Sequence, residues 1–430
     1  MTGIVETPRV TATSSGELLA RRLAIFTSHP IQYQAPYFRA LASSGRVSPT
    51  TFFGSRHGLD VSLDSGFGTA FQWDVPLVEG YEHTFVENVA RHPDVSRFTG
   101  VRTSNFRGAL ARGQFDALLV LGWQTMAHVQ AVQSAWSLGI PVIVRGESTL
   151  QRAPVRGARG AARRLLWLPA RKRLYAAAFE RIAAFLVIGT RNRDYYRSFG
   201  VPDEKMFRAP YGVDNAWFAL SEPARTFARA RVRDAIGVGA HSVVFASSAK
   251  LIERKRPMDL LDAVGRARQH GVPAHALFIG DGDLRASLER RAAEQGIRDA
   301  VTISGFINQA DLPAWYAAAD ALVLPSDARE TWGLVVNEAM AAGLPVVVSD
   351  AAGCAPDLVE EGANGWTYAC GDVAALVDRL ARLAALGSDG RTAFGQRSRA
   401  IVARFGIDVA ASATVAATEA VTSGSRRGRA

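Results

Sequence analysis

The chain has 430 residues, of which 48% are apolar and 21% charged, and this composition excludes wholesale disorder. The length exceeds what one compact core usually accommodates, so we expect two domains. The formal net charge of +10 favours an anionic partner. Composition does not decide whether this partner is nucleic acid, acidic lipid or a phosphorylated small molecule.

The sequence shows no sign of secretion or of a membrane span. No apolar run reaches the roughly 18 to 20 residues that cross a bilayer, and residues 1–20 form an irregular arm without an apolar signal core. The two cysteines, Cys354 and Cys370, are more simply interpreted as free thiols than as a disulfide. We therefore expect a cytoplasmic protein with a flexible N-terminal arm.

From residue 21 onward, strand and helix patterns alternate, which predicts an α/β fold with parallel sheets covered by helices. Residues 55–100 are aromatic, His-bearing and aperiodic, and a long irregular segment inside a compact domain is often functional. In the first predicted domain, over 21–210, we expect strands over 22–28, 115–122, 140–146 and 183–189 and helices over 34–43 and 125–138.

The alternation pauses over 211–225 and then restarts, which predicts a second domain over 211–405, followed by a C-terminal helix and basic tail over 406–430. Two Rossmann-like, doubly wound domains that face each other form a cleft at the carboxyl ends of their strands, where such sheets bind ligands. In the second domain we expect strands over 242–248, 275–280, 300–305 and 319–326 and helices over 257–270 and 283–295.

The stretch ARETWGLVVNEAMAAGLPVVVSD, residues 328–350, places Glu330 and Glu338 beside a core strand. Its short helix packs an apolar stripe on the sheet, so Glu338, on the opposite side, faces the cleft. The first helical turn, at Gly333 and Leu334, presents unpaired amides that can cradle a phosphate, and ionised carboxylates can accept from the hydroxyls of a nucleotide sugar. The alternative is that both glutamates are solvated surface residues.

The same stretch resembles the retaining glycosyltransferases of the GT-B fold in family 4, the glycosyl transferases group 1. Their signature is two glutamates separated by seven residues before a helix, then an A-x-G-x-P-V-V strand, here AAGLPVVVSD. APYGVD (209–214) is similar to the family's P-x-G-V-D junction and IGDGDLR (279–285) to its G-x-G turn. The resemblance covers residues 205–405 and implies two Rossmann-like domains facing across a cleft.

The segment KLIERK, residues 250–255, is similar to the family's R-L-x-x-x-K element, with Lys250 in place of the arginine and Lys255 matching the lysine. Two cations in a loop after a strand can neutralise a diphosphate and stabilise the charge that builds on it as a glycosidic bond breaks. Lysine lacks the bidentate fork of arginine, so donor affinity or selectivity can differ from the family's.

In SGFIN (304–308) the resemblance places Phe306 and Ile307 near the nucleotide base. The acidic pair Asp281 and Asp283 in the G-x-G turn has an alternative interpretation as a metal site of the D-x-D kind. The resemblance implies instead that cations and helix amides manage the leaving phosphate, with no cofactor and no essential metal.

The activity that the resemblance implies is transfer of a hexose or related sugar from a nucleoside diphosphate sugar to an acceptor hydroxyl with retention of configuration. Lys250, Lys255 and the helix amides would stabilise the departing diphosphate, Glu338 would bind the ribose and Glu330 would position the sugar. The product would be a cell-surface polysaccharide, glycolipid or related glycoconjugate. A nucleotide-sugar epimerase or hydrolase on the same fold, or a non-catalytic nucleotide-sugar-binding protein, is the alternative.

The first domain departs from the family pattern, because the loop after its first strand, SHPIQYQAPY (28–37), lacks the usual glycines. His29 is either a base or hydrogen-bond partner for the acceptor hydroxyl or a helix cap. Arg145 and Glu147, in RGES, are further acceptor-side candidates, with an ion pair in the cleft wall as the alternative. The acceptor is a glycan, a lipid-linked molecule or a small molecule, and the 55–100 segment is expected to select it.

Residues 152–185 are rich in arginine and carry Trp167 among leucines. A basic amphipathic surface of this kind can lie on anionic lipid, which would place the protein at the inner face of the membrane as a peripheral protein. A solvated basic helix with an ordinary core face is the alternative. Nucleic acid is not expected as a partner, because the segment has no recognised binding module and few interleaved aromatics.

Overall fold

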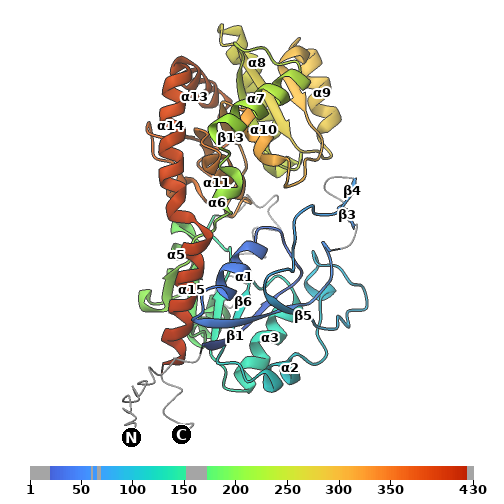
Figure 1. Cartoon of the computed structure of the whole chain (residues 1–430), viewed down its shortest axis with the longest axis vertical. Coiled ribbons are helices and arrows are strands. Elements are labelled where there is room, and N and C mark those ends of the chain that lie inside the picture. Colours follow the sequence, from blue (N-terminus) through green and yellow to red (C-terminus); the bar gives the residue numbers. More distant parts are fainter. Residues whose placement is uncertain (1–19, 60–61, 65–68, 152–171, 424–430) are drawn as a thin grey trace, which may run out of the picture.

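The computed structural model describes residues 20–59, 62–64, 69–151 and 172–423 of the chain. Two domains lie one above the other, and a long C-terminal helical run, drawn in red, passes along both (Figure 1). Each domain is built on one parallel sheet with helices around it, which confirms the predicted α/β architecture of two Rossmann-like units.

The first sheet has seven strands that all pair in parallel. Chain order reverses between β1 and β6, so the loops after these strands diverge and open a ligand-binding crevice. In spatial order the strands are β5 (Glu82–Phe85), β2 (Val47–Phe53), β1 (Arg21–Thr27), β6 (Ala117–Leu121), β7 (Val142–Arg145), β8 (Ala184–Val187) and β9 (Met206–Arg208). The helices are α1 (Ala35–Ala42), α2 (Phe106–Gly113), α3 (Met126–Ser137) and α5 (Thr190–Arg197), with a further helical segment over 172–180, and β3 (Ser62–Asp64) and β4 (Thr69–Phe71) form a separate antiparallel pair.

Alternate residues of β1 enter the cores on the two faces of this sheet, as the period of a strand requires. Leu23 and Ile25 pack in the cluster that contains residues of α1, and Ala24 and Phe26 pack in the cluster that contains residues of α2 and α3. Burial on both faces explains why the strand is a continuous apolar run.

The second sheet has six parallel strands and reverses its order between β10 and β13. The loops after β10 and β13 therefore diverge at the carboxyl edge of this sheet and open a second crevice. In spatial order the strands are β12 (Val301–Ile303), β11 (Ala274–Ile279), β10 (Val243–Ser248), β13 (Ala321–Leu324), β14 (Val346–Ser349) and β15 (Gly365–Tyr368). The helices are α6 (Asn215–Phe218), α7 (Glu222–Ala235), α8 (Pro257–Gln269), α9 (Arg285–Glu294), α10 (Leu312–Ala318), α11 (Leu334–Ala341), α12 (Ala355–Leu358), α13 (Val373–Ala385) and α14 (Gly387–Val402).

The last helix, α15 (Ile407–Thr422), returns to the first domain. Ala411 and Val415 are buried in the core cluster on the α1 face of the first sheet, and the Thr414 and Tyr37 hydroxyls are hydrogen-bonded at 2.7 Å. The chain therefore crosses between the domains twice, at residues 209–214 and again between α14 and α15. These crossings tie the domains together on one side.

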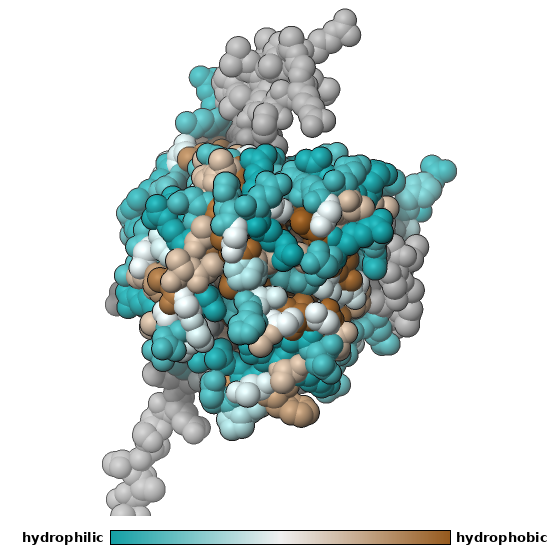
Figure 2. Space-filling view, turned by 90° about the horizontal axis from the view of Figure 1, so that it is seen from above, coloured by the Kyte–Doolittle hydropathy of each residue, from teal (hydrophilic) through white to brown (hydrophobic). Residues whose placement is uncertain are grey.

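The helical run Gly387–Thr422 is long and apolar enough to pass as a candidate membrane span by length and composition, and half of its most apolar window is buried in the protein. Packing of α15 on the first sheet accounts for this apolar character. At the far end of the second domain, hydrophilic side chains surround small apolar patches (Figure 2), as is usual on a solvent-exposed face.

Candidate functional site

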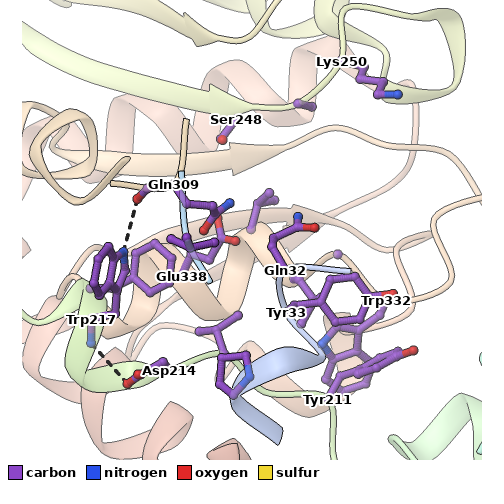
Figure 3. Close-up of a pocket in the computed structure, with 18 of the residues that line it drawn as sticks. Gln32, Tyr33, Tyr211, Asp214, Trp217, Ser248, Lys250, Gln309, Trp332 and Glu338 are labelled. Carbon is purple, nitrogen blue, oxygen red and sulfur yellow. Dashed lines mark hydrogen bonds between the residues drawn. The ribbon is translucent and has the colours of Figure 1, made fainter. Parts of the chain in front are cut away.

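A cavity of about 1180 Å³ lies between the domains, at the carboxyl ends of both sheets. Side chains from both domains and from the connection between them surround it (Figure 3). From the first domain it is lined by the loop after β1, by segment 74–80 and by Glu147 after β7. From the second domain it is lined by the loops after β10 and β13 and by the start of α11. This is the position that the topology predicts for a ligand.

The amino-terminal end of α11 opens onto this cavity. Gly333 caps the helix with φ of +105°, and a Cβ there would lie 2.7 Å from Leu324 Cδ2, so only glycine fits without strain. Leu334 and Val335 also line the cavity, and helix geometry gives their amides no acceptor within the helix. The structure therefore places this helix end in the cavity wall, and its use as an anion cradle stays a prediction.

The loop after β10 brings cations to the same end of the cavity. Lys250 and Lys255 both line it, and so does Arg254, which the sequence pattern did not single out although it lies inside KLIERK. The Lys255 ammonium forms an ion pair with Glu330, and Arg254 Nη1 lies 3.7 Å from the same carboxylate. Three cations and two helix amides therefore line the same cavity.

Glycines of the predicted G-x-G turn support this cationic loop. Gly280 and Gly282 have φ of +145° and +154°, and a Cβ on either would strike the backbone of Ala249 or Leu251. The Leu251 amide donates to the Asp281 carbonyl at 2.9 Å. The Asp281 side chain pairs with Arg285 at 2.7 Å, and the described residues contain no group of three or more histidine, cysteine or acidic side chains placed to hold a metal.

Glu330 is nearly buried, with 12% of its side chain exposed, so it is not a solvated loop residue. Burial by itself would raise the pKa of this carboxyl, but the charge and hydrogen bond of Lys255, together with Arg254, hold the pKa below its usual range. Glu330 is therefore ionised at neutral pH and orients the Lys255 ammonium.

Glu338 differs from Glu330 in its ionisation. It lines the cavity from α11 and accepts a hydrogen bond from the Tyr316 hydroxyl at 2.6 Å. Burial raises its pKa to about 7, against the lowering effects of Tyr316 and Lys255. The prediction that Glu338 faces the cleft agrees with its place in the cavity wall, whereas Tyr316, on α10, gave no signal in the local sequence.

The backbone of the loop that carries Glu330 is clamped by the turn before α12. The Gly353 amide donates to the Glu330 carbonyl at 2.9 Å and the Cys354 amide donates to the Trp332 carbonyl at 3.0 Å. A Cβ on Gly353 would lie 1.8 Å from the Thr331 carbonyl oxygen, so the two segments touch backbone to backbone. The position of Glu330 therefore depends on residues 350–354.

The first domain also contacts the 350–354 turn. Arg191, on α5, donates to the Ala352 carbonyl at 2.9 Å and also to the Asp350 carbonyl. The Thr190 amide and hydroxyl donate to the Asp357 carboxylate at 2.9 and 2.8 Å. Because these contacts cross between the domains, they couple the domain arrangement to the Glu330 loop.

Of the acceptor-side candidates, Glu147 lines the cavity and Arg145 does not. Glu147 accepts from the Tyr211 hydroxyl and from Thr331 Oγ1 at 3.1 Å, so it contacts the Glu330 loop across the cleft. The buried Arg145 guanidinium donates to the Pro210 carbonyl at 2.9 Å and lies 4.6 Å from the Tyr211 ring centre. The expected alternative, an ion pair between Arg145 and Glu147, is wrong, because Arg145 instead fixes the interdomain connection.

His29 lies outside the cavity lining. Its Nδ1 is 2.8 Å from Ser28 Oγ, and its ring meets His57 edge-on at 5.2 Å. Burial, followed by repulsion from His57 and His128, lowers the pKa of His29 to about 4, so the imidazole is neutral at pH 7. His29 therefore has Ser28 as a polar partner and does not line the cavity.

The predicted base contacts also lie beside the cavity and not in its lining. Phe306 meets the Trp73 ring at 6.3 Å, and Ile307 packs against the second-domain core. Gln309, two residues further along the same loop, lines the cavity instead. Most of the proposed membrane-binding segment, residues 152–171, lies outside the described residues, so that prediction stays open.

Residues 229–400 match the family model described as glycosyl transferases group 1. This match covers most of the second domain, which we call the group 1 domain. Over 224 residues the chain is 34% identical to the GDP-mannose-dependent alpha-(1-6)-phosphatidylinositol monomannoside mannosyltransferase of Mycolicibacterium smegmatis, which covers 49% of this chain and 56% of that protein. Over 237 residues it is 32% identical to the D-inositol 3-phosphate glycosyltransferase of Xylanimonas cellulosilytica, covering 53% of this chain and 55% of that protein.

The chain thus spans about half the length of the curated relatives it matches. Among solved structures, HepE of Anabaena in complex with UDP aligns with a TM-score of 0.67 at 18% identity, covering 90% of this chain and 96% of that chain. This likeness extends over both domains and shows that the group 1 domain and the first domain together form a GT-B fold.

Glu338 gives the group 1 domain a specific pH dependence of stability. Its folded pKa of about 7 lies above the ordinary 4.5, so the folded state binds an extra proton between these values and loses stability as pH rises through them. We expect Glu338→Gln, which cannot ionise, to gain roughly 3 kcal/mol over the native protein at pH 8 and little at pH 4.5. Urea unfolding at the two pH values measures this.

Glu294→Gln, at an exposed glutamate of α9 with 57% of its side chain accessible, is the matched control and should show no such gain. A Glu338→Gln effect of the same size at both pH values would show that burial does not hold the proton on Glu338.

The clamp on the Glu330 loop can be tested through amide exchange. Removing the Arg191 side chain deletes charged hydrogen bonds to the 350–352 turn, so we expect Arg191→Ala to speed exchange of the Gly353 and Cys354 amides about tenfold or more. Arg193→Ala is the control, since Arg193 on the same helix pairs with Asp203 within the first domain. Equal protection of the two amides in both variants would contradict the coupling.

Proposed function

We propose that the protein is a glycosyltransferase that moves a sugar from a nucleoside diphosphate sugar to an acceptor hydroxyl with retention of configuration. The observation that carries the proposal is the Lys255–Glu330 pair beside the α11 amino terminus in the interdomain cavity. The match of residues 229–400 to the glycosyl transferases group 1 family and the glycosyltransferase names of the two relatives support it.

The donor diphosphate would lie on the Leu334 and Val335 amides, within reach of Lys250, Arg254 and Lys255. Lys255 is held by Glu330 and the two amides by the helix before the ligand arrives, and preorganised donors stabilise developing charge without reorganisation at the moment of reaction. The partial positive charge of the helix end adds to the three cations. In this proposal, part of the chain's net positive charge serves to bind a phosphorylated ligand and not nucleic acid.

The ribose of the donor would donate hydroxyl hydrogen bonds to Glu338, one helical turn beyond the phosphate cradle. Hydrogen bonds from hydroxyls favour the ionised carboxylate, so donor binding should lower the pKa of Glu338 from about 7. Glu330, already ionised, would position the sugar and stabilise positive charge at its anomeric carbon as the bond breaks.

In the proposed reaction the bond between the anomeric carbon and the phosphate oxygen breaks while the acceptor oxygen bonds to that carbon from the same face. The acceptor proton passes to the departing phosphate, and the negative charge of the leaving group is held by Lys250, Lys255 and the helix amides. No enzymic nucleophile and no metal is needed in this scheme, because protein cations neutralise the diphosphate.

The acceptor would be a glycan, a lipid-linked molecule or a small molecule, and the product a cell-surface polysaccharide, glycolipid or related glycoconjugate. The two relatives, whose names include a phosphatidylinositol monomannoside and an inositol phosphate, are consistent with this range of acceptors. The proposal places the enzyme in the cytoplasm, with the basic 152–185 segment at the inner face of the membrane. Liposome flotation with anionic vesicles tests the membrane contact, and absence of binding to these vesicles would refute it.

Release of nucleoside diphosphate from a panel of nucleotide sugars tests the site. Loss of one preorganised charge typically costs about 100-fold in rate, so we expect Lys255→Ala and Glu330→Ala each to slow release by roughly that factor. Lys205→Ala is the control, because Lys205 donates to first-domain carbonyls away from the cavity. Release at the native rate by both site variants would refute the assignment, and the anomeric configuration of the product, read by NMR, tests retention.

Removal of divalent metal tests the role given to the cations. We expect the rate of nucleoside diphosphate release to be unchanged by excess EDTA, since Lys250, Arg254 and Lys255 supply the positive charge. A loss of release that is restored by adding Mg²⁺ or Mn²⁺ would contradict this part of the scheme.

A further inference from the structure

Trp217 is an exposed aromatic side chain in the wall of the cavity. It is 45% exposed, and among the large apolar side chains that are exposed in the described residues it is the one that also lines this cavity. An indole face left in water forgoes the free energy that burying it would release. A ligand that covers Trp217 would recover this free energy.

The indole is held in place before any ligand binds. Its Nε1–H donates to the Gln309 carbonyl at 3.1 Å, and its backbone amide donates to Asp214 Oδ1 at 3.3 Å (Figure 3). The next residue, Phe218, is buried in the second-domain core at 3% exposure. Trp217 is therefore a fixed platform, and fixing a contact in advance lowers the entropic cost of binding.

The surroundings of Trp217 are acidic. Asp214 and Asp74 line the cavity, and Asp74 accepts from the Ala310 amide at 3.2 Å, next to Gln309. Arg39 also lines it, but its guanidinium donates to the Pro76 carbonyl at 3.2 Å and so shapes the wall. In Figure 3, Trp217, Gln309 and Asp214 lie on one side, and Lys250 and Trp332 lie on the other.

This separation of charge indicates the class of ligand. An anionic group would be repelled by carboxylates near Trp217 and attracted to Lys250, Arg254 and Lys255 at the other end. A sugar ring without charge has an apolar C–H face that can pack on the indole and hydroxyl groups at its edge that can donate to carboxylates. A neutral sugar can therefore contact both the indole face and the carboxylates of this wall.

We propose that the Trp217 wall binds an uncharged sugar ring of the acceptor. The inference rests on the proposed glycosyltransferase function and adds the chemical class of the acceptor. Trp217 and the first-domain wall opposite it lie outside residues 229–400, the part that matches the family, whereas the proposed diphosphate and ribose contacts lie inside it.

Ligand-observed NMR with methyl α-glucoside, methyl α-mannoside and methyl α-galactoside tests the platform, with glucose 6-phosphate as an anionic probe. We expect at least one methyl glycoside to bind the native protein and Phe227→Ala, and to bind Trp217→Ala about tenfold more weakly or worse. Phe227 is a suitable control because it is 70% exposed on α7 and lies outside the cavity lining. Trp217→Phe, which keeps an aromatic face, should retain binding.

Two results would overturn the inference. One is that no methyl glycoside shows binding that depends on Trp217, and the other is that glucose 6-phosphate binds through Trp217 as well as the neutral sugars do.

Titration of UDP, GDP, ADP, CDP and dTDP into the native protein and Trp217→Ala separates this inference from the proposed function. We expect equal affinity in both proteins. Weaker nucleotide binding by Trp217→Ala would make the indole a platform for the donor base and would overturn the acceptor assignment. If no nucleotide of this panel binds the native protein, the proposed function fails, and the glycoside titration still decides whether Trp217 binds a neutral sugar.

Discussion

A nearly buried ion pair between Lys255 and Glu330 is the interaction on which the geometry of the cavity depends. Two charges withdrawn from water are costly unless each compensates the other, and removal of either partner leaves an uncompensated charge. The protein therefore holds both loops firmly, the Lys255 loop against Gly280 and Gly282 and the Glu330 loop against Gly353. A pair fixed in this way holds the ammonium in the wall of the cavity that the amino terminus of α11 also lines, where an anionic ligand would complete the charge balance.

The two domains contribute to this geometry in different ways. The group 1 domain supplies the cations, the helix end and both glutamates, and the first domain supplies contacts that restrain them. Glu147 reaches Thr331, Arg191 grips the turn behind Glu330, and Arg145 fixes the connection at Pro210. The return of α15 to the first sheet adds a second tie. A change in the angle between the domains would therefore move Glu330, so the arrangement of the domains and the chemistry of the site are linked.

Local periodicity and the family resemblance predicted β1, β6, β7 and β8, most of the second sheet, and the Glu338 side of α11. They did not predict β2, whose Pro49 removes a ladder donor, or β5 and β9, which are short and not apolar runs. Contacts between distant segments were also missed, since Tyr316 with Glu338 and Arg191 with Ala352 leave no local pattern. The residue classes were predictable, whereas the partners that set their ionisation and position required the fold.

The central claim is that a nucleoside diphosphate binds at the Lys255–Glu330 end of the cavity. A ligand that binds only the folded state stabilises it by about 2.7 kcal/mol at a concentration 100 times its Kd. Thermal unfolding with UDP, GDP, ADP, CDP and dTDP therefore tests the claim most directly. At least one nucleotide should raise the Tm of the native protein and of Lys205→Ala, and leave that of Lys255→Ala nearly unchanged. A panel that shifts no Tm, or that shifts Lys255→Ala as much as the native protein, would contradict the account.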